Sequence, residues 1–285
     1  MINPLRAAAL LRRAILGLDN TGSTGLNYTG AQYSRQTQDW IWAPIASADQ
    51  EARWDMARLR ARARELARNN PQAVRYLSMC GENVVGEHGM RFQARVQRPG
   101  GKLDISINDA IEASWGDWCM PENADAAGRA SFVDQEWSAI VACARDGEAL
   151  FRKLRGFPNE FGFALQQIDI DRLDHTLNRP PGARENEIRM GVEVDEWGRP
   201  VNYWLWTRHP YDLNGSGTRH HEPVPADEII YLGRQQRPGQ TRDVTWFAPV
   251  MLPMRMLGGF AEAELVAARM GASSMGFFIQ DEDGV

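Results

Sequence analysis

The stretch RNNPQAVRYLSMCGENVVGEHGMRFQ, Arg68–Gln93, decides how the first half of the chain is organised. Residues 51–69 consist of good helix formers without glycine, so they predict a helix. Pro71 disfavours helical geometry at Asn70 and suits the first position of a new helix. The sequence therefore predicts two helices joined directly at Asn70, the second ending at the glycines before Met90.

Apolar residues predict which sides of these elements face a core. In the first helix they are Trp54, Leu59 and Leu66, and in the second Val74, Leu77 and Val84. The following segment, residues 90–97, alternates apolar and polar residues, which predicts a half-buried strand.

Composition places the chain among globular proteins. It has 285 residues, 43% of them hydrophobic, and ten tryptophans. The net charge of −5 argues against a protein that clamps nucleic acid over its whole surface. Cys80, Cys119 and Cys143 form no CxxC pair, so neither a disulfide framework nor a structural zinc site is expected.

Residues 1–48 are expected to form a flexible arm. Arg6, Arg12 and Arg13 interrupt the first apolar run, which favours an amphipathic, partner-docking or poorly ordered segment over a membrane anchor. Residues 19–47 are rich in small and polar residues. No uncharged run reaches the length of a bilayer span.

The middle of the chain predicts an α+β fold with helices packed on a mostly antiparallel β region. Helices are expected over residues 103–120 and 131–144; the first should turn Ile105, Ile111, Trp115 and Trp118 inward. Ser131 and Asp134 have the spacing of a capping box. The remainder to residue 233 alternates or runs apolar between turns and predicts strands: EALFRKLR, FALQQIDI, RMGVEVDEW and VNYWLWTR.

The C-terminal part predicts a long helix beginning near Pro253. Residues at steps of four and three form one stripe: Ala261, Leu265, Ala268, Ala272 and Met275. Its small residues favour close approach by neighbouring helices, and an ordinary core helix is the alternative. GFFIQ then predicts the start of a strand and DEDGV a turn, which suggests a piece of a longer protein.

Motifs for nucleophilic, dinucleotide, phosphate-loop and zinc-protease chemistry are absent. The densest group of candidate metal ligands is Asp169, Asp171, Asp174 and His175. On an alternating strand Asp169 and Asp171 would share one face and could hold a hard cation. A strand ending in a solvated turn, with Asp171 capping a short helical turn, is the favoured interpretation. His220 and His221 are expected to be exposed in a polar loop. No cofactor, metal or catalytic residue is therefore assigned.

Six arginines spread around the helix over residues 53–68, among them Arg58 and Arg62. Such a spread suits pairing with carboxylates of another subunit or domain better than a directed DNA patch. A plain solvated face is the other alternative.

Several stretches together resemble one family. They are RARELARNNPQA at Arg62–Ala73, then Asn83, Val85, Gly86, Gly89 and Arg91, and further blocks at residues 124–154, 165–174, 188–210, 224–257 and 263–279. This order is similar to that of the lambda-type portal protein family of tailed phages, over about residues 50–285. Asp169 stands where a glutamate is common, Asp243 where a glycine is usual and Thr245 where a proline is usual.

The resemblance implies a non-enzymatic structural protein of the virion, assembled in the host cytoplasm as a ring, usually a dodecamer, at one capsid vertex. Its partners would be other copies of itself, the terminase large subunit, the major capsid or scaffold protein, head–tail connector proteins and double-stranded DNA passing without sequence specificity. No membrane would be involved.

The resemblance also implies domain boundaries: a wing domain at 49–246, a first stem helix at 247–276 and the start of a clip region at 277–285. Ala261, Leu265, Ala268, Ala272, Met275, Arg58 and Arg62 are the expected oligomer interface. The alternative function is a metal-dependent nuclease or hydrolase using Asp169, Asp171 and His175.

Overall fold

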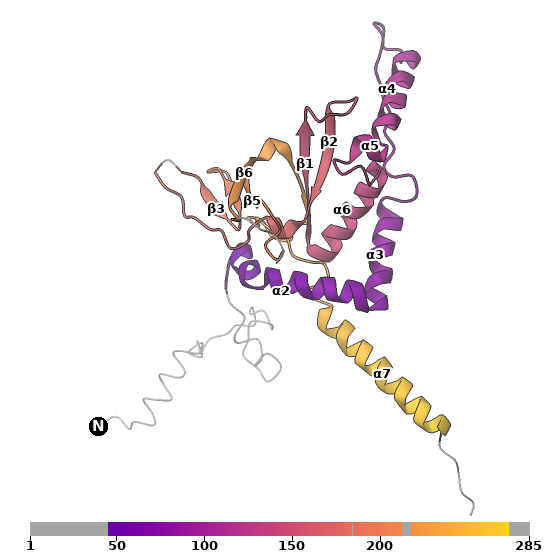
Figure 1. Cartoon of the computed structure of the whole chain (residues 1–285), viewed down its shortest axis with the longest axis vertical. Helices are drawn as coiled ribbons and strands as arrows, with labels where there is room; N and C mark the ends of the chain where they lie inside the picture. Colours follow the sequence, from indigo (N-terminus) through magenta and orange to yellow (C-terminus); the bar gives the residue numbers. More distant parts are fainter. Residues whose placement is uncertain (1–44, 184, 213–217, 274–285) are drawn as a thin grey trace, which may run out of the picture. The chain divides into compact units, whose positions relative to one another are not determined.

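Two helices meet at Asn70 in the computed structural model, which describes residues 45–183, 185–212 and 218–273 (Figure 1). The Asn70 N–H donates to the Leu66 carbonyl at 2.9 Å and ends α2, Ala48–Asn69. The Asn70 side chain accepts from the Ala73 N–H at 3.0 Å and opens α3, Pro71–Val84. The predicted break between two adjoining helices is confirmed.

The other helices are α4 Ile105–Trp118, α5 Pro121–Ala124, α6 Phe132–Asp146 and α7 Met251–Ser273, with short 3-10 turns η3 Ile170–Arg172 and η4 Ala226–Glu228. The strands are β1 Glu148–Arg155, β2 Phe163–Ile168, β3 Glu187–Arg189, β4 Val192–Val194, β5 Pro200–Trp206, β6 His221–Pro225 and β7 Ile229–Gly233. All strand pairs are antiparallel, in two sheets ordered β2-β1-β7 and β3-β4-β5-β6. The predicted α+β fold class is confirmed.

Strand β1 is buried on both faces. Leu150 packs with residues of the second sheet, including Val192 and Leu205, whereas Ala149 and Phe151 pack against Ala142 and its neighbours on α6. Successive residues of a strand point to opposite faces, so β1 contributes to two core clusters. The first sheet therefore lies between α6 and the second sheet (Figure 1).

Residues 90–97 were predicted as a half-buried strand, and this prediction is wrong. The segment is extended, but its one β-bridge joins Gln97 to Leu103. Side chains of α4 take the place of a neighbouring strand: Glu112 accepts from the Ala94 N–H at 2.9 Å and Asn108 from the Val96 N–H at 2.8 Å. Buried backbone donors need an acceptor, and α4 supplies it.

Several apolar residues predicted to face a core are instead exposed: Trp54, Val74, Val84, Ile105 and Ile111. Leu66, Leu77 and Trp118 are buried as predicted. Helix α4 is packed mainly at its C-terminal end, where Trp115 and Trp118 contact Phe132, so Ile105 and Ile111 nearer its start remain exposed.

Helix α7 begins at Met251, two residues before the predicted start, with Pro253 in its first turn. Met251 and Met254 pack against the core cluster that contains Phe247. From Arg255 to Ser273 every residue of the helix is exposed. This rules out the alternative of an ordinary core helix within the described part of the chain. None of the described helices is both long and apolar enough to cross a membrane.

The capping box predicted at Ser131 and Asp134 is confirmed at the start of α6, and Gly147 ends that helix with φ of 97°. A Cβ on Gly147 would meet the Val244 carbonyl carbon at 2.5 Å and the Asp243 oxygen at 2.7 Å. Glycine is thus required both by the left-handed backbone and by the close approach of a second segment.

We expect Gly147→Ala to lower the free energy of unfolding by about 2–5 kcal/mol, because overpacking adds to the left-handed strain. Gly156→Ala is the matched control, since Gly156 has φ of 72° but nothing within 4 Å of its added Cβ. It should cost only about 1–2 kcal/mol. Urea denaturation measures both, and equal losses would contradict the close packing at Gly147.

Candidate functional site

The arginines of α2 divide between the inside and the outside of the molecule. Arg60 is 2% exposed and lies among the buried residues Met56 and Ala63. Its guanidinium bonds to Asp171 Oδ1 and Glu148 Oε1, both at 2.7 Å. Arg64 bonds to Asp146 at 2.8 Å and to Asp171 Oδ2 at 2.6 Å. These contacts join α2 to the end of α6, to β1 and to η3.

Glu148 is the centre of this network. Glu148 and Arg242 are both fully buried, and Arg242 Nε donates to the two carboxylate oxygens at 3.0 and 2.8 Å. The Tyr231 hydroxyl donates to Glu148 Oε2 at 2.6 Å. Burial by itself would raise the pKa of Glu148, but Arg242 and Arg60 lower it below its usual value. The carboxylate is therefore charged and paired on both sides.

A second carboxylate, Asp243, lies beside this centre. Its Oδ2 is 3.1 Å from the Tyr231 hydroxyl, and its Oδ1 accepts from Gln240 at 3.1 Å. Burial raises the pKa of Asp243 to about 6, and the charge of Glu148 contributes to the rise. Tyr231 has one hydroxyl hydrogen, and Glu148 is the nearer acceptor. Asp243 thus holds a proton more readily than an exposed aspartate.

We expect Glu148→Gln to cost about 3–5 kcal/mol of the free energy of unfolding, because the change removes the carboxylate between Arg60 and Arg242 and leaves buried charge uncompensated. Asp227→Asn is the control, because Asp227 forms an exposed pair with Arg155. Thermal and urea unfolding measure both variants. Similar small losses in the two variants would argue against the network as the main link between α2 and the sheets.

We expect Asp243→Asn to stabilise the protein at alkaline pH. The folded-state pKa is raised, so the favourable contribution of Asp243 is fully present below the unfolded pKa and is lost as pH rises through about 6. An amide stays neutral at every pH, so the gain should be about 1–3 kcal/mol at pH 8 and much smaller at pH 4. Urea unfolding at the two pH values, with Asp227→Asn as control, measures it; an equal effect at both would contradict this assignment.

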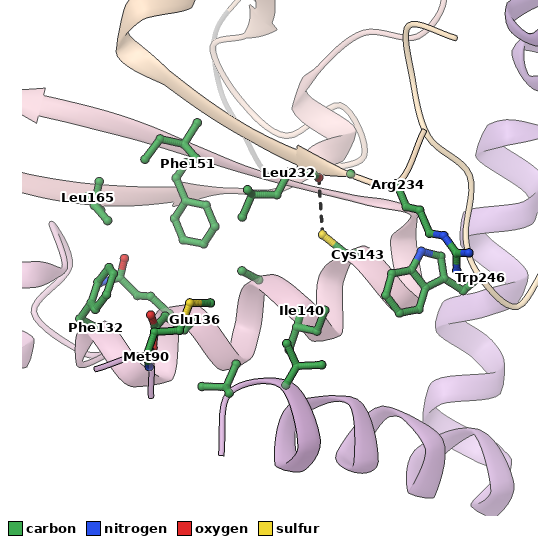
Figure 2. A pocket seen from close by; sticks show the side chains of 16 residues that line it. Met90, Phe132, Glu136, Ile140, Cys143, Phe151, Leu165, Leu232, Arg234 and Trp246 are labelled. Carbon is green, nitrogen blue, oxygen red and sulfur yellow. Dashed lines mark hydrogen bonds between the residues drawn. The ribbon is translucent and has the colours of Figure 1, made fainter. Parts of the chain in front are cut away.

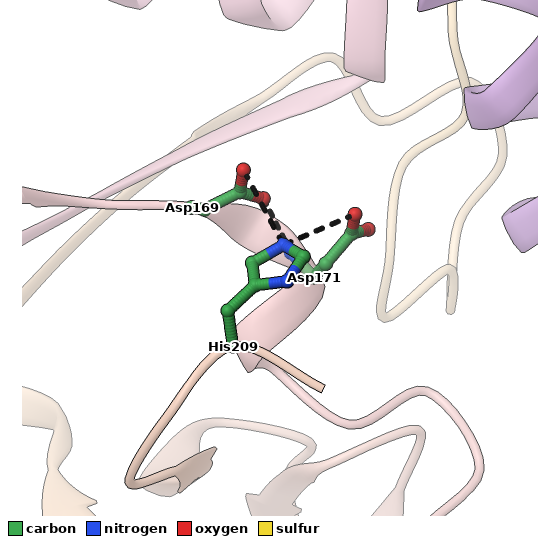
Figure 3. A group of neighbouring side chains, drawn as sticks. All are labelled: Asp169, Asp171 and His209. Carbon is green, nitrogen blue, oxygen red and sulfur yellow. Dashed lines mark hydrogen bonds and ion pairs between the residues drawn. The ribbon is translucent and has the colours of Figure 1, made fainter. Parts of the chain in front are cut away.

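The predicted metal ligands come together only in part. Asp169 and Asp171 lie near His209, whose Nε2 is 3.7 and 3.8 Å from their carboxylates (Figure 3). Asp174 instead pairs with His221 at 2.8 Å, and His175 is not in the group. Asp169, not Asp171, caps η3 by accepting from the Asp171 N–H. His221 was expected to be exposed and is half-buried against Trp206.

Arginines already neutralise the carboxylates of Asp169 and Asp171. Asp171 bonds to both Arg60 and Arg64, and Asp169 bonds to Arg64 at 3.1 Å. A divalent cation would have to displace these guanidinium groups, and no fourth ligand joins the three within the described residues. The geometry therefore favours a structural role.

A cavity of about 460 Å³ lies between α6 and the first sheet (Figure 2). Its lining is mainly apolar and includes Phe132, Ile140, Phe151 and Leu232. Cys143 donates to the Leu232 carbonyl, and burial raises the pKa of its thiol to about 11. A thiol with this pKa is not a nucleophile at neutral pH, so Cys143 does not serve as a nucleophile in this cavity.

The predicted interface residues are exposed wherever the structure describes them. Ala261, Leu265, Ala268 and Ala272 lie on the exposed part of α7, and Met275 is outside the described residues. Arg58 and Arg62 are exposed on α2 and form no ion pair with any residue that the structure describes. The DEDGV turn and residues 1–44 also lie outside the described residues.

Sequence reasoning missed the roles of Arg60, Glu148 and Arg242. One signal for Arg60 was present: it falls in the same series of helical positions as Ala52, Met56 and Ala63. An arginine within an apolar stripe needs a buried acceptor.

Comparison with known protein families identifies the family of this chain. The family model described as phage portal protein, lambda family, matches residues 33–284. The chain belongs to this family. Among its relatives, the probable portal protein of Halomonas phage phiHAP-1 is 37% identical over 257 residues, 90% of this chain and 49% of the relative.

Two more distant portal proteins align over similar lengths. The portal protein of Escherichia phage N15 is 24% identical, over 86% of this chain and 47% of its own length. Portal protein B of Escherichia phage lambda is 23% identical, over 89% of this chain and 50% of its own length. The chain thus spans about half the length of the curated relatives it matches.

Proposed function

We propose that this chain is the wing and first-stem part of a portal that forms a ring at one vertex of a phage capsid, through which DNA is packaged and ejected. The match to the lambda family of portal proteins over residues 33–284 carries the proposal. In this assignment residues 1–48 are an arm, 49–246 the wing domain, 247–276 the first stem helix and 277–285 the start of the clip.

Helix α7 supports the assignment to a stem. Apolar side chains are exposed along it, among them Phe260, Leu265 and Val266. A helix with apolar residues on several sides is normally buried by other elements. Within the described part of the chain, only Met251 and Met254 of this helix pack against a core cluster, so further copies of the chain are the proposed cover.

The proposed partners follow from that position. They are other copies of the chain, in a ring of twelve, the terminase large subunit, the major capsid or scaffold protein and head–tail connector proteins. The protein would be assembled in the host cytoplasm and carried in the virion. Its net charge of −5 suits a channel through which DNA slides, because basic contacts grip phosphates regardless of base sequence.

Electron microscopy of the purified chain tests the proposal directly. Rings viewed down a central channel are the expected result. A chain that stays monomeric at all concentrations would contradict ring formation by this part of the protein.

We expect Ala268→Trp to prevent ring closure while the subunit remains folded. Ala268 is exposed in the subunit, so a larger side chain meets no neighbour there, whereas overpacking at each contact of a ring costs about 1–3 kcal/mol. The change in melting temperature should be small. Ala268→Ser, which adds one oxygen, is the control and should leave rings intact. A variant that unfolds, or one that still forms rings, would contradict the stem assignment.

We expect no nuclease or ATPase activity from the chain. Asp169 and Asp171 are occupied by Arg60 and Arg64, which supports a structural rather than a metal-binding role. The measurement is nicking of supercoiled DNA with Mg²⁺ or Mn²⁺, together with phosphate release from ATP. Metal-dependent nicking that disappears in Asp171→Ala would instead support the metal-dependent nuclease.

A further inference from the structure

Helix α4 and the extended segment before it form a layer with two oppositely charged faces. We call residues 90–103 the basic hairpin and α4 with α5 the acidic helix pair. The hairpin turns at Gly100 and Gly101, which have φ of 110° and 81°. From Lys102 to Arg129 no basic residue intervenes, and between His88 and Asp104 there is no acidic one.

Arg91 and Arg95 of the basic hairpin point away from α4, whereas Arg98 pairs with Asp104 at the start of that helix. Phe92 packs on Trp115 with ring centroids 5.1 Å apart, and Ala94 is buried. Side chains alternate along an extended backbone, so Arg91 and Arg95 lie on the opposite, outer side. Both are exposed and form no ion pair with any described residue.

The free carboxylates of α4 lie on its other side. Asn108 and Glu112 hold the hairpin by hydrogen bonds. At about 100° per residue, Asp109 lies about 100° and Asp117 about 180° around the helix from Asn108. Both aspartates are exposed and, like the arginines, are unpaired among the residues that the structure describes.

We propose that the outer face of the basic hairpin in one copy binds the acidic face of α4 in a second copy. The charges are complementary and belong to opposite sides of one layer, so every copy offers one face of each kind. Contacts between two different surfaces of identical chains join head to tail and generate a ring when the rotation closes. Ile105 and Ile107, exposed on the same helix, add apolar area to the contact.

A nucleic acid partner fits this layer less well. The basic hairpin alone would attract phosphates, but the acidic helix pair directly behind it carries Asp109, Asp117 and Glu122 with no basic residue. A second copy is attracted by both faces at once. The inference rests on the proposed ring and names the surface through which neighbouring wing domains meet.

Charge exchange tests this contact. Arg91→Glu with Arg95→Glu places carboxylates against the acidic face, and Asp109→Arg with Asp117→Arg places arginines against the hairpin. Each double variant should weaken subunit association by about tenfold or more, since each converts attraction to repulsion. The chain carrying all four changes should regain association. Mass photometry at several subunit concentrations, at low and at high salt, measures subunit association. The control is Arg155→Glu plus Arg199→Glu, which reverses two exposed charges elsewhere.

Each possible result either supports or contradicts the proposed contact. Loss in both double variants, recovery in the fourfold variant and weakening of the wild type by salt support the contact. The contact is wrong if the wild type assembles and the double variants assemble equally well. It is also wrong if the fourfold variant fails to recover association. In both cases the proposed ring itself is not contradicted. If the wild type never associates, the proposed ring fails together with this contact.

Discussion

A carboxylate with no access to water sets the main constraint on this subunit. Glu148 begins β1 between two guanidinium groups, Arg60 from α2 and Arg242 from the segment that leads to α7. Charges buried in this way are tolerated only when they are paired and hydrogen-bonded. One residue therefore fixes the helical layer, the first sheet and the approach to the C-terminal helix with respect to one another.

The same network explains why α2 has arginines on several sides. Arg60 and Arg64 face inward and are held by the carboxylates of three separate segments, whereas Arg58 and Arg62 face outward. The arginines of α2 were predicted to pair with carboxylates of another domain or subunit. The chemistry of that prediction is correct for the inner arginines, because they do bind carboxylates. The partners belong to the same chain, 82 to 111 positions away.

Local signals in the sequence predicted much of the fold. The Asn70–Pro71 junction and the capping box at Ser131 depend on neighbouring residues alone, and both are present. Strands β1, β2, β4 and β5 were also recognisable, because alternation and turn residues are local. Strand β3 was not, because the chain turns at Met190 and Gly191 inside the stretch predicted as one strand. Long-range placement could not be predicted from the sequence. Nothing near residues 90–97 reveals that α4, rather than a strand, supplies the hydrogen-bond acceptors for their backbone N–H groups. Likewise, Asp169 and Asp171 have the spacing of metal ligands, and the arginines that occupy them come from a helix about a hundred residues earlier.

The exposed apolar surface of α7 also affects the free subunit before any assembly. Phe260, Leu265 and Val266 are in contact with water until something covers them, and each square ångström of such surface costs about 25 cal/mol. Large exposed apolar patches are also aggregation sites. A newly folded subunit therefore has a limited lifetime, in which burial of this helix competes with precipitation and proteolysis. In the proposed ring, the yield of correct assemblies would then depend on how fast subunits are synthesised as well as on their affinity.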